Sequence, residues 1–306
     1  MKVLFIGAGS IGKRHIRDFF NECEYHGIIP EIQVLRRKVG DLGELNKYVS
    51  KQITELVDSD YDITFITNPT NLHYEVLSSL VNRTKFYFIE KPIFEKTTYD
   101  ISSLGINDFN SYVAAPMRHT SLYKKIKNIV QKNKVFSARV MCSSYLPEWR
   151  KNVDYRTVYS AKKDMGGGVG LDLIHEIDYV YDLFGPPESV FAASGKFSDL
   201  DITSNDLSVY ILKYKSMLCE IHLDYFGRRS VRTCELFTKE GSYVADFFKE
   251  ILYVPDGSTI DCHVKSNEEF INEMHHFYNF INGKEQSLNP PSLALKTLDI
   301  AIKGDY

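Results

Sequence analysis

Three glycines near the N-terminus are the first residues whose spacing points to chemistry. Gly7, Gly9 and Gly12 form the pattern GxGxxG in "GAGSIG", directly after the apolar run "KVLFIG" and at the start of a helical pattern. In this setting the first glycine allows a tight turn, the second lets backbone approach a pyrophosphate, and the third lets the helix lie close to the sheet. The N-terminus of that helix, with Ser10 and Ile11, then faces the phosphates. We therefore expect a dinucleotide site rather than a glycine-rich turn without a ligand.

The end of the second apolar run predicts which dinucleotide is preferred. A carboxylate at this position usually binds the adenosine ribose, but here "VLRR" ends in Leu35, Arg36 and Arg37. Because an arginine suits a 2′-phosphate, NADP is favoured over NAD. The alternative is that both arginines are ordinary surface charges.

Lys91 stands at the end of another apolar run, "FYFIEKP" (residues 86–92), between Glu90 and Pro92. If this run is a strand of the dinucleotide-binding sheet, Lys91 lies at the carboxyl edge, where such sheets bind ligands. An ammonium group there can stabilise negative charge that develops on a reacting oxygen. The alternative is a solvated lysine after the end of a strand.

The spacing of the apolar runs predicts two domains with different sheets. In the first third of the chain, runs of strand length alternate with helical patterns, which indicates a doubly wound parallel sheet. After about residue 120 a helix is followed by long strands with short, turn-like spacing, which indicates an open, mostly antiparallel sheet in an α/β domain. We expect a dinucleotide-binding domain at 1–118 and a second domain at 119–306. The expected strands of the first sheet are residues 2–7, 31–37, 61–69, 86–92 and 111–117.

The composition excludes several classes of protein. Among 306 residues, 43% are hydrophobic and 25% are charged, and the net charge is −3, so neither nucleic acid nor an anionic membrane is an expected partner. No apolar run has the length of a membrane span or a signal peptide. The five cysteines are widely scattered without a CxxC pair. This pattern favours free thiols in the cytoplasm and argues against a metal site or a disulfide framework.

A glycine run followed by a helical pattern, "GGGVGLDLIHEIDYVYDLFG" (residues 166–185), carries two further candidates. Asp172 and His175 are spaced i, i+3, which places them on one face of a helix. A lone histidine on a helix is more often structural or solvated than catalytic. An imidazole with a pKa near neutrality can nevertheless accept a hydroxyl proton, and a neighbouring carboxylate can orient it or bind an adjacent hydroxyl.

Several motifs in the same order resemble the glucose–fructose oxidoreductase/inositol dehydrogenase/MocA-like oxidoreductases. They are "GAGSIG", "TNPTNLHYE" (67–75), "IEKPI" (89–93), the 166–185 segment and "CELFTKEGSYVADF" (234–247), and they span nearly the whole chain. The resemblance implies hydride transfer between NAD(P) and a carbinol or ketone carbon. It also implies a Rossmann domain at 1–118 and a substrate-binding and oligomerisation domain at 119–306. In this family homodimers or homotetramers are expected to form through the exposed face of the open sheet.

The resemblance assigns roles residue by residue. Lys91, Asp172 and His175 match the catalytic residues of the family. Most members space the aspartate and histidine i, i+4, so the i, i+3 spacing here is a departure that leaves the reach of the pair open. The implied cofactor-binding residues, beyond the glycine turn and the two arginines, are Thr67, Asn68, Pro69, His73, Glu90 and Lys91.

The substrate is expected to be a sugar or a nucleotide-sugar derivative, such as those of surface polysaccharide biosynthesis. The segment 145–163 is rich in polar aromatic and cationic side chains, which suit a sugar ring and its hydroxyls, although an ordinary surface loop is an equal alternative. Two other functions stay open: reduction of a non-sugar substrate of tetrapyrrole or dihydrodiol type, and NAD(P) sensing without catalysis. The expected substrate-binding residues are Arg118, which the resemblance adds, and Trp149, Arg156, Tyr159 and Lys163.

Overall fold

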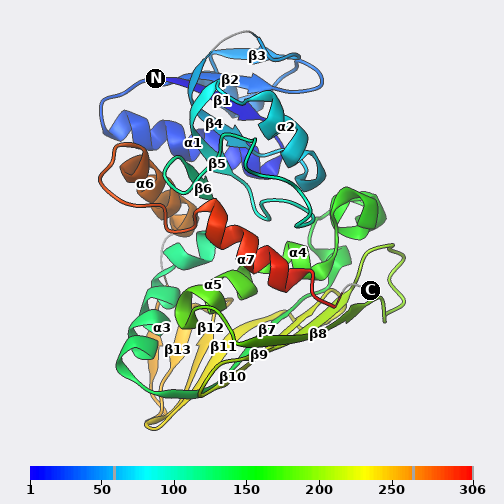
Figure 1. The fold of residues 1–306 in the computed structure, drawn as a ribbon, viewed down its shortest axis with the longest axis vertical. Helices are drawn as coiled ribbons and strands as arrows, with labels where there is room; N and C mark the ends of the chain where they lie inside the picture. Colours follow the sequence, from blue (N-terminus) through cyan, green and yellow to red (C-terminus); the bar gives the residue numbers. More distant parts are fainter. Residues whose placement is uncertain (58–59, 264–265, 305–306) are drawn as a thin grey trace. The chain divides into compact units, whose positions relative to one another are not determined.

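The computed structural model describes residues 1–57, 60–263 and 266–304, and the chain forms two compact units. The first comprises Met1–Pro116 and Asn267–Lys296, and the second comprises Met117–Ser266 and Thr297–Tyr306. Each unit has its own sheet (Figure 1). The first boundary lies close to the expected residue 118. We expected the second domain to run without a break from residue 119 to residue 306, but residues 267–296 belong to the first unit.

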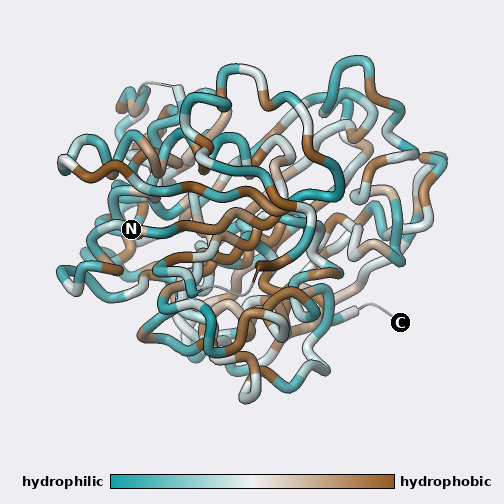
Figure 2. Tube along the Cα trace, turned by 90° about the horizontal axis from the view of Figure 1, so that it is seen from above, coloured by the Kyte–Doolittle hydropathy of each residue, from teal (hydrophilic) through white to brown (hydrophobic). Residues whose placement is uncertain are grey.

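The described residues of the first unit form a six-stranded sheet with the order β3-β2-β1-β4-β5-β6, in which all neighbouring strands are parallel. This is the strand order of the doubly wound dinucleotide-binding fold, as expected. Hydrophobic residues dominate the strand that leaves the N-terminus and the strands beside it (Figure 2). The five expected strands are confirmed, whereas β3 was missed because "KQI" contains no apolar run. The strands are β1 (Lys2–Ile6), β2 (Glu31–Leu35), β3 (Lys51–Ile53), β4 (Tyr61–Ile66), β5 (Thr84–Ile89) and β6 (Ser111–Val113).

A helix from near the C-terminus completes the core of the first unit, and it corrects the expected domain division. The helices of this unit are α1 (Ser10–Tyr25), α2 (His73–Ser79) and α6 (Glu268–Ile281). Met274 and Phe277 of α6 are fully buried in one cluster with Phe19 of α1 and Phe65 of β4. Burying these side chains gives α6 a strong hydrophobic reason to join the first unit. The boundary between the units then falls within α7 (Pro291–Ala301).

In the described residues, the second unit contains an eight-stranded open sheet with the order β14-β13-β12-β11-β7-β10-β9-β8. Only β7 and β10 pair in parallel there, so the expectation of a mostly antiparallel sheet is confirmed. The strands are β7 (Val135–Ser143), β8 (Ser189–Gly195), β9 (Leu207–Lys213), β10 (Leu218–Asp224), β11 (Val231–Thr238), β12 (Gly241–Asp246), β13 (Ile251–Tyr253) and β14 (Thr259–Asp261).

The two faces of this sheet differ in exposure. In β10, Cys219, Ile221 and Leu223 are fully buried, whereas Leu218 is exposed, which is the alternation expected of a sheet covered on one face. Helices α3 (Ser121–Lys132), α4 (Val169–Asp172) and α5 (Ile174–Phe184) belong to this unit, and both α4 and α5 contact its strands (Figure 1). Phe191 of β8 is a further large apolar residue that stays exposed.

The expected helix within residues 166–185 is interrupted. This break corrects the expectation that Asp172 and His175 lie on one face of a single helix. Helix α4 (Val169–Asp172) ends before Leu173, and α5 (Ile174–Phe184) begins after it. The backbone of Leu173 has φ −97° and ψ 28°, far from the helical ψ of about −42°. Asp172 and His175 therefore lie on two helical segments, and the i, i+3 rule does not place them on one face.

Short 3-10 turns make up most of the remaining regular structure. Four of them fall in the segment expected to bind substrate, so this segment is a chain of ordered turns. All five cysteines lie within the described residues, where they are buried free thiols. None of the described helices is long and apolar enough to cross a membrane. The 3-10 turns are η1 (Gly43–Lys47), η2 (Thr70–Leu72), η3 (Pro116–His119), η4 (Leu146–Glu148), η5 (Tyr155–Thr157), η6 (Tyr159–Ala161) and η7 (Lys163–Met165).

Candidate active site

The glycine turn after β1 has the geometry that a dinucleotide requires. Gly7 has φ +95°, a conformation that favours glycine. A Cβ atom at Gly12 would lie 2.8 Å from Oγ1 of Thr67 and 2.9 Å from the carbonyl oxygen of Gly7, so only glycine lets α1 lie this close. At Gly9, by contrast, no described atom lies within 4 Å of the Cβ position, so the backbone there borders open space.

These environments predict different effects for two similar substitutions. Gly9→Ala is expected to leave folding unchanged but to weaken nucleotide binding about tenfold to a hundredfold, because the new methyl group occupies the space that the pyrophosphate needs. Gly12→Ala is expected to destabilise the fold by about 1–3 kcal/mol through overpacking. Thermal unfolding and nucleotide titration of both variants measure the two effects. Gly40→Ala is the control, since its Cβ also meets no described atom within 4 Å. Equal nucleotide affinity in Gly9→Ala and wild type would contradict this reading.

The residues after β4 hold the glycine turn in place. Oγ1 of Thr67 lies 3.0 Å from the carbonyl oxygen of Ile6 and 3.1 Å from that of Gly7. His73 is fully buried, with its ring nitrogens 3.0 Å from the carbonyl oxygens of Ile93 and Asn68, and burial lowers its pKa. The side chains of Thr67 and His73 thus form hydrogen bonds with the protein's own backbone carbonyl groups. Their expected contact with the cofactor stays a prediction, as does that of Pro69, the residue just before the turn η2.

The side chain of Asn68 has an unusual environment. Its amide nitrogen and oxygen are both buried and have no hydrogen-bond partner among the described residues. Buried polar groups are nearly always hydrogen-bonded, so such an amide indicates a missing ligand. Gly9 is the N-terminal cap of α1 and has no side chain that could accept hydrogen bonds from the first backbone N–H groups of the helix. These groups, which begin at Ser10 and Ile11, can therefore bind a phosphate. These features together fit a nicotinamide dinucleotide.

The two arginines after β2 differ in their surroundings. Nη1 of Arg36 lies 3.2 Å from Oε1 of Gln52, which fixes the guanidinium beside the end of the strand. Arg37 is exposed. Asp41, the next carboxylate along the chain, already accepts hydrogen bonds from Gly43 and Asn46. The end of β2 therefore presents cations and no available carboxylate from this segment.

Lys91 follows β5 and is anchored through the carboxylate before it. The backbone N–H of Lys91 donates to Oε2 of Glu90 at 3.2 Å, and Oε1 of Glu90 lies 2.5 Å from Nε2 of the fully buried His15 of α1. Burial alone would raise the pKa of Glu90, but its bond to His15 and the charges of His15 and Lys91 outweigh burial and lower it. Glu90 therefore acts as a buried anchor for the backbone of Lys91, and a direct contact with the cofactor stays a prediction.

Asp172 is the centre of a buried polar cluster in the second unit. Its Oδ2 accepts a hydrogen bond of 2.5 Å from the hydroxyl of Tyr225. Burial, together with the charge of Asp172 and a hydrogen bond to it, raises the pKa values of Tyr225 and Tyr159 well above the usual value. Both hydroxyls therefore stay protonated and donate to the carboxylate. Asp172 is held in a fixed orientation, as an orienting or hydroxyl-binding carboxylate must be.

His175, at the start of α5, is half-buried. The residue that follows it, Glu176, is fully buried, and its Oε1 lies 2.7 Å from Nε of Arg232. This buried ion pair fixes the first turn of α5 against β11. The imidazole of His175 therefore projects from a helix whose first turn is fixed, and part of the imidazole is accessible to solvent.

The structure brings two of the expected substrate-binding residues to the Asp172 cluster. Tyr159 bonds to Asp172 as described, and the ring of Trp149 packs edge-on against Tyr225 at 5.2 Å. Arg156 instead is exposed and pairs with Asp154 at 2.7 Å.

The glycine run before α4 fixes this loop. A Cβ at Gly167 would collide with the carbonyl oxygens of Tyr159, Ser160 and Lys162, so the loop packs directly against the run. Lys163 is exposed and lines a small cavity with the glycines that follow. Contact of Arg156 and Lys163 with a substrate stays a prediction.

Arg118 has a different environment from the one expected of a substrate-binding residue. Its side chain is 2% exposed, and it donates from Nε and Nη2 to both carboxylate oxygens of Asp178, at 2.8 and 2.7 Å. Nη1 lies 3.2 Å from Asp182. Burial opposes the charge of Arg118, but Asp178 and then Asp182 outweigh it and raise its pKa. The guanidinium is used in a buried ion pair with Asp178 and Asp182. We therefore replace the expected substrate-binding role of Arg118 by a structural one.

Two residues that matter for the site were missed from the sequence. They are Tyr225 and His15, neither of which is among the candidates that the sequence analysis names. His15 falls on the buried side of α1 with Ile16 and Phe19, where a histidine needs a polar partner. That signal could have identified His15. No sequence signal links Tyr225 to Asp172, because their contact depends on the order of strands in the second sheet.

Comparisons with known proteins agree with this geometry. The profile described as "Oxidoreductase family, NAD-binding Rossmann fold" (GFO_IDH_MocA) matches residues 1–105, and the profile of the "GFO/IDH/MocA C-terminal domain" matches residues 123–244. The "Uncharacterized oxidoreductase YrbE" of Bacillus subtilis (strain 168) is 26% identical over 198 residues. That match covers 62% of this chain and 55% of the relative, little more than half of the relative's length.

Solved structures show the same fold at low identity. A levoglucosan dehydrogenase in complex with NADH and levoglucosan has a TM-score of 0.83 at 16% identity, covering 98% of this chain and 95% of that one. The myo-inositol 2-dehydrogenase from Lactobacillus plantarum has a TM-score of 0.76 at 18% identity, covering 100% and 96%. The WlbA dehydrogenase from Chromobacterium violaceum, in complex with NADH and UDP-GlcNAcA, has a TM-score of 0.77 at 17% identity, covering 100% and 92%.

The fold and the glycine turn define a two-domain oxidoreductase with an NAD-binding Rossmann fold. With both domain profiles matched in order, the chain belongs to the GFO/IDH/MocA family of oxidoreductases, as the sequence motifs indicated.

Proposed function

We propose that the protein is an NAD(P)-dependent dehydrogenase that transfers a hydride between the nicotinamide and a carbinol or ketone carbon of a sugar or nucleotide-sugar derivative. The arrangement of the first sheet carries this proposal. The glycine turn, Asn68 and Lys91 follow β1, β4 and β5, which are neighbouring parallel strands, so all three stand at one carboxyl edge. A dinucleotide and an ammonium group at the same edge suit hydride transfer at an oxygen-bearing carbon.

The residues divide the proton and charge chemistry among them. The bound dinucleotide supplies or accepts the hydride. His175 takes the hydroxyl proton as the carbonyl forms, because imidazole can both accept and return a proton near neutral pH. Lys91 stabilises negative charge on the same oxygen. Asp172, oriented by two tyrosine hydroxyls, binds a substrate hydroxyl or orients the imidazole.

The substrate class rests on the second unit and on the named neighbours. Trp149 and Tyr159 place aromatic surface next to a buried carboxylate, which suits a ring that carries hydroxyl groups. Levoglucosan, myo-inositol and a UDP-linked sugar are named with three proteins of the same fold. The test is to follow the reduction of NAD⁺ and NADP⁺ with cyclic polyols, free sugars, nucleotide sugars and a dihydrodiol. Turnover with a dihydrodiol and with none of the carbohydrates would contradict the proposal.

We also propose that NADP is preferred over NAD, because Arg36 and Arg37 replace the carboxylate that would bind the ribose and repel a 2′-phosphate. A charge-assisted bond of roughly 1.5–3 kcal/mol gives a preference of about tenfold to a hundredfold. Arg36→Ala is therefore expected to weaken NADPH binding far more than NADH binding. Fluorescence titration of both nucleotides measures this, and NADH binding as tight as NADPH in the wild type would show that the preference is wrong.

The exposed face of the second sheet supports a homodimer or homotetramer. Phe191, Ile211 and Leu218 lie exposed on neighbouring strands β8, β9 and β10. An exposed apolar patch on a large sheet commonly marks a protein interface.

A further inference from the structure

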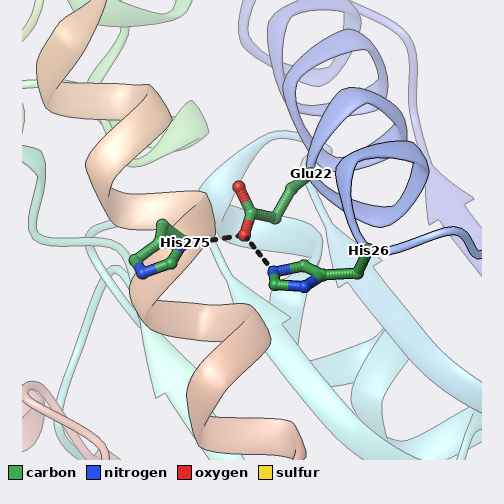
Figure 3. Close-up of side chains that lie close together, drawn as sticks. All are labelled: Glu22, His26 and His275. Atoms are coloured by element: carbon green, nitrogen blue, oxygen red, sulfur yellow. Dashed lines mark hydrogen bonds and ion pairs between the residues drawn. The ribbon is translucent and has the colours of Figure 1, made fainter.

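A group of potential metal ligands lies in the first unit, at the opposite end of α1 from the glycine turn. Glu22 lies in the last turns of α1, His26 caps the C-terminus of that helix, and His275 lies on α6. Helices α1 and α6 pack against each other within this unit. Figure 3 shows both imidazole rings directed at one carboxylate oxygen of Glu22.

The three side chains already converge on one point. Oε1 of Glu22 lies 3.1 Å from Nε2 of His26 and 2.8 Å from Nδ1 of His275. These three atoms all lie within 4.8 Å of one another. Ligand distances of about 2.0–2.2 Å around a tetrahedral zinc ion imply ligand–ligand spacings of roughly 3.3 Å. Small rotations of the two rings are therefore sufficient to enclose an ion.

We propose that Glu22, His26 and His275 bind one transition-metal ion of the zinc class. Imidazole nitrogens and a carboxylate oxygen are among the ligands that zinc prefers. Glu22 and His26 are spaced i, i+4, the spacing with which two ligands on one helix share a metal. The side chain of Glu22 is only 10% exposed while that of His275 is 52% exposed, so an ion can enter from solvent and keep a water as fourth ligand.

The surroundings hold His26 in place, and they show what must change around His275. The ring of His26 stacks on Tyr278 of α6 with centroids 4.2 Å apart and planes 2° apart. Nε2 of His275 lies 3.2 Å from the side-chain nitrogen of Asn279, which also donates to Glu285. With a metal ion on Nδ1 the proton of His275 lies on Nε2, so the NH2 group of Asn279 must then turn away from this nitrogen.

The competing explanation needs no metal. Two neutral imidazoles that each donate one hydrogen bond to the carboxylate would also join α1 to α6. The sequence argued against a metal site from its cysteines alone, and it could not reveal ligands that lie 253 positions apart. Only metal binding itself separates the two explanations.

The experiment uses the full-length chain without an affinity tag, after removal of metals with a chelator. Zn²⁺ is titrated by calorimetry, and Co²⁺ by its visible absorption, which reports tetrahedral coordination. We expect one equivalent of either ion per chain and a higher Tm in its presence. Glu22→Gln, which keeps the volume and the hydrogen bonds, and His275→Ala should each weaken binding by more than about tenfold, since changing even a second-shell partner costs that much.

The matched control is His263→Ala, which removes an exposed histidine of the second unit that pairs with Asp261. This variant should bind Zn²⁺ like the wild type. Uptake of less than one equivalent, or uptake that is the same in Glu22→Gln, His275→Ala and the wild type, would show adventitious ions only and overturn the proposal. The outcome is independent of the dehydrogenase activity, because the three ligands lie outside the residues proposed for catalysis.

Discussion

Replacing Lys91 by alanine is expected to lower turnover about a hundredfold or more, with nucleotide binding and folding largely intact. The ammonium group stabilises charge that exists only while the substrate oxygen loses or gains its proton, so its loss affects the transition state more than the ground state. The backbone at this position should not move, because Glu90 remains bonded to the Lys91 N–H and to His15. The substitution therefore removes the amine and little else.

The control is Lys85→Ala, a lysine near the opposite end of the same strand. Lys85 is exposed and pairs with Asp62 at 2.7 Å, far from the carboxyl edge. Its removal is expected to leave both turnover and affinity unchanged. Steady-state kinetics give kcat and KM, and nucleotide titration gives Kd for each variant. Near-normal kcat in Lys91→Ala would refute the catalytic assignment of Lys91, while an equal loss in Lys85→Ala would point to a defect in folding.

The sequence predicted the first sheet well because its strands are buried on both faces. Such strands are continuous apolar runs, and glycines with fixed spacing mark the turn that follows β1. Gly7 and Gly12 adopt the roles expected of them, since a positive φ and a close helix–sheet contact are local requirements of the backbone. Position at a strand end also predicted Lys91 at the carboxyl edge. These inferences needed only neighbours in the chain or the general rule for parallel sheets.

The errors arose where distant segments meet. The apolar stripe of α6 could pack on either unit, and only the structure shows Phe277 beside Phe19 and Phe65. The break at Leu173 likewise follows no sequence signal, since leucine is a strong helix former. Arg118 shows the same limit, because its buried partner Asp178 lies 60 positions further along the chain. A cation near the right strand can serve a ligand or a buried carboxylate, and spacing alone does not distinguish the two.

Arg118 allows that distinction to be tested. Arg118→Ala is expected to destabilise the second unit by about 3–5 kcal/mol, because Asp178 loses a two-pronged partner in a buried site and is left with an uncompensated charge. Urea unfolding followed by the fluorescence of Trp149, the single tryptophan, reports on this unit specifically. Arg156→Ala is the matched control: the same residue type in the same unit, exposed, with little expected effect on the urea midpoint.

A double variant separates structural charge pairing from substrate binding. Arg118→Met combined with Asp178→Leu removes both charges, so it should be more stable than Arg118→Met alone, in which Asp178 stays buried without its partner. A substrate-binding role makes the opposite prediction: Arg118→Met alone would raise KM and leave the urea midpoint near that of the wild type. Because Nε and Nη2 of Arg118 both contact Asp178 and Nη1 contacts Asp182, we expect the loss of stability, with rescue in the double variant.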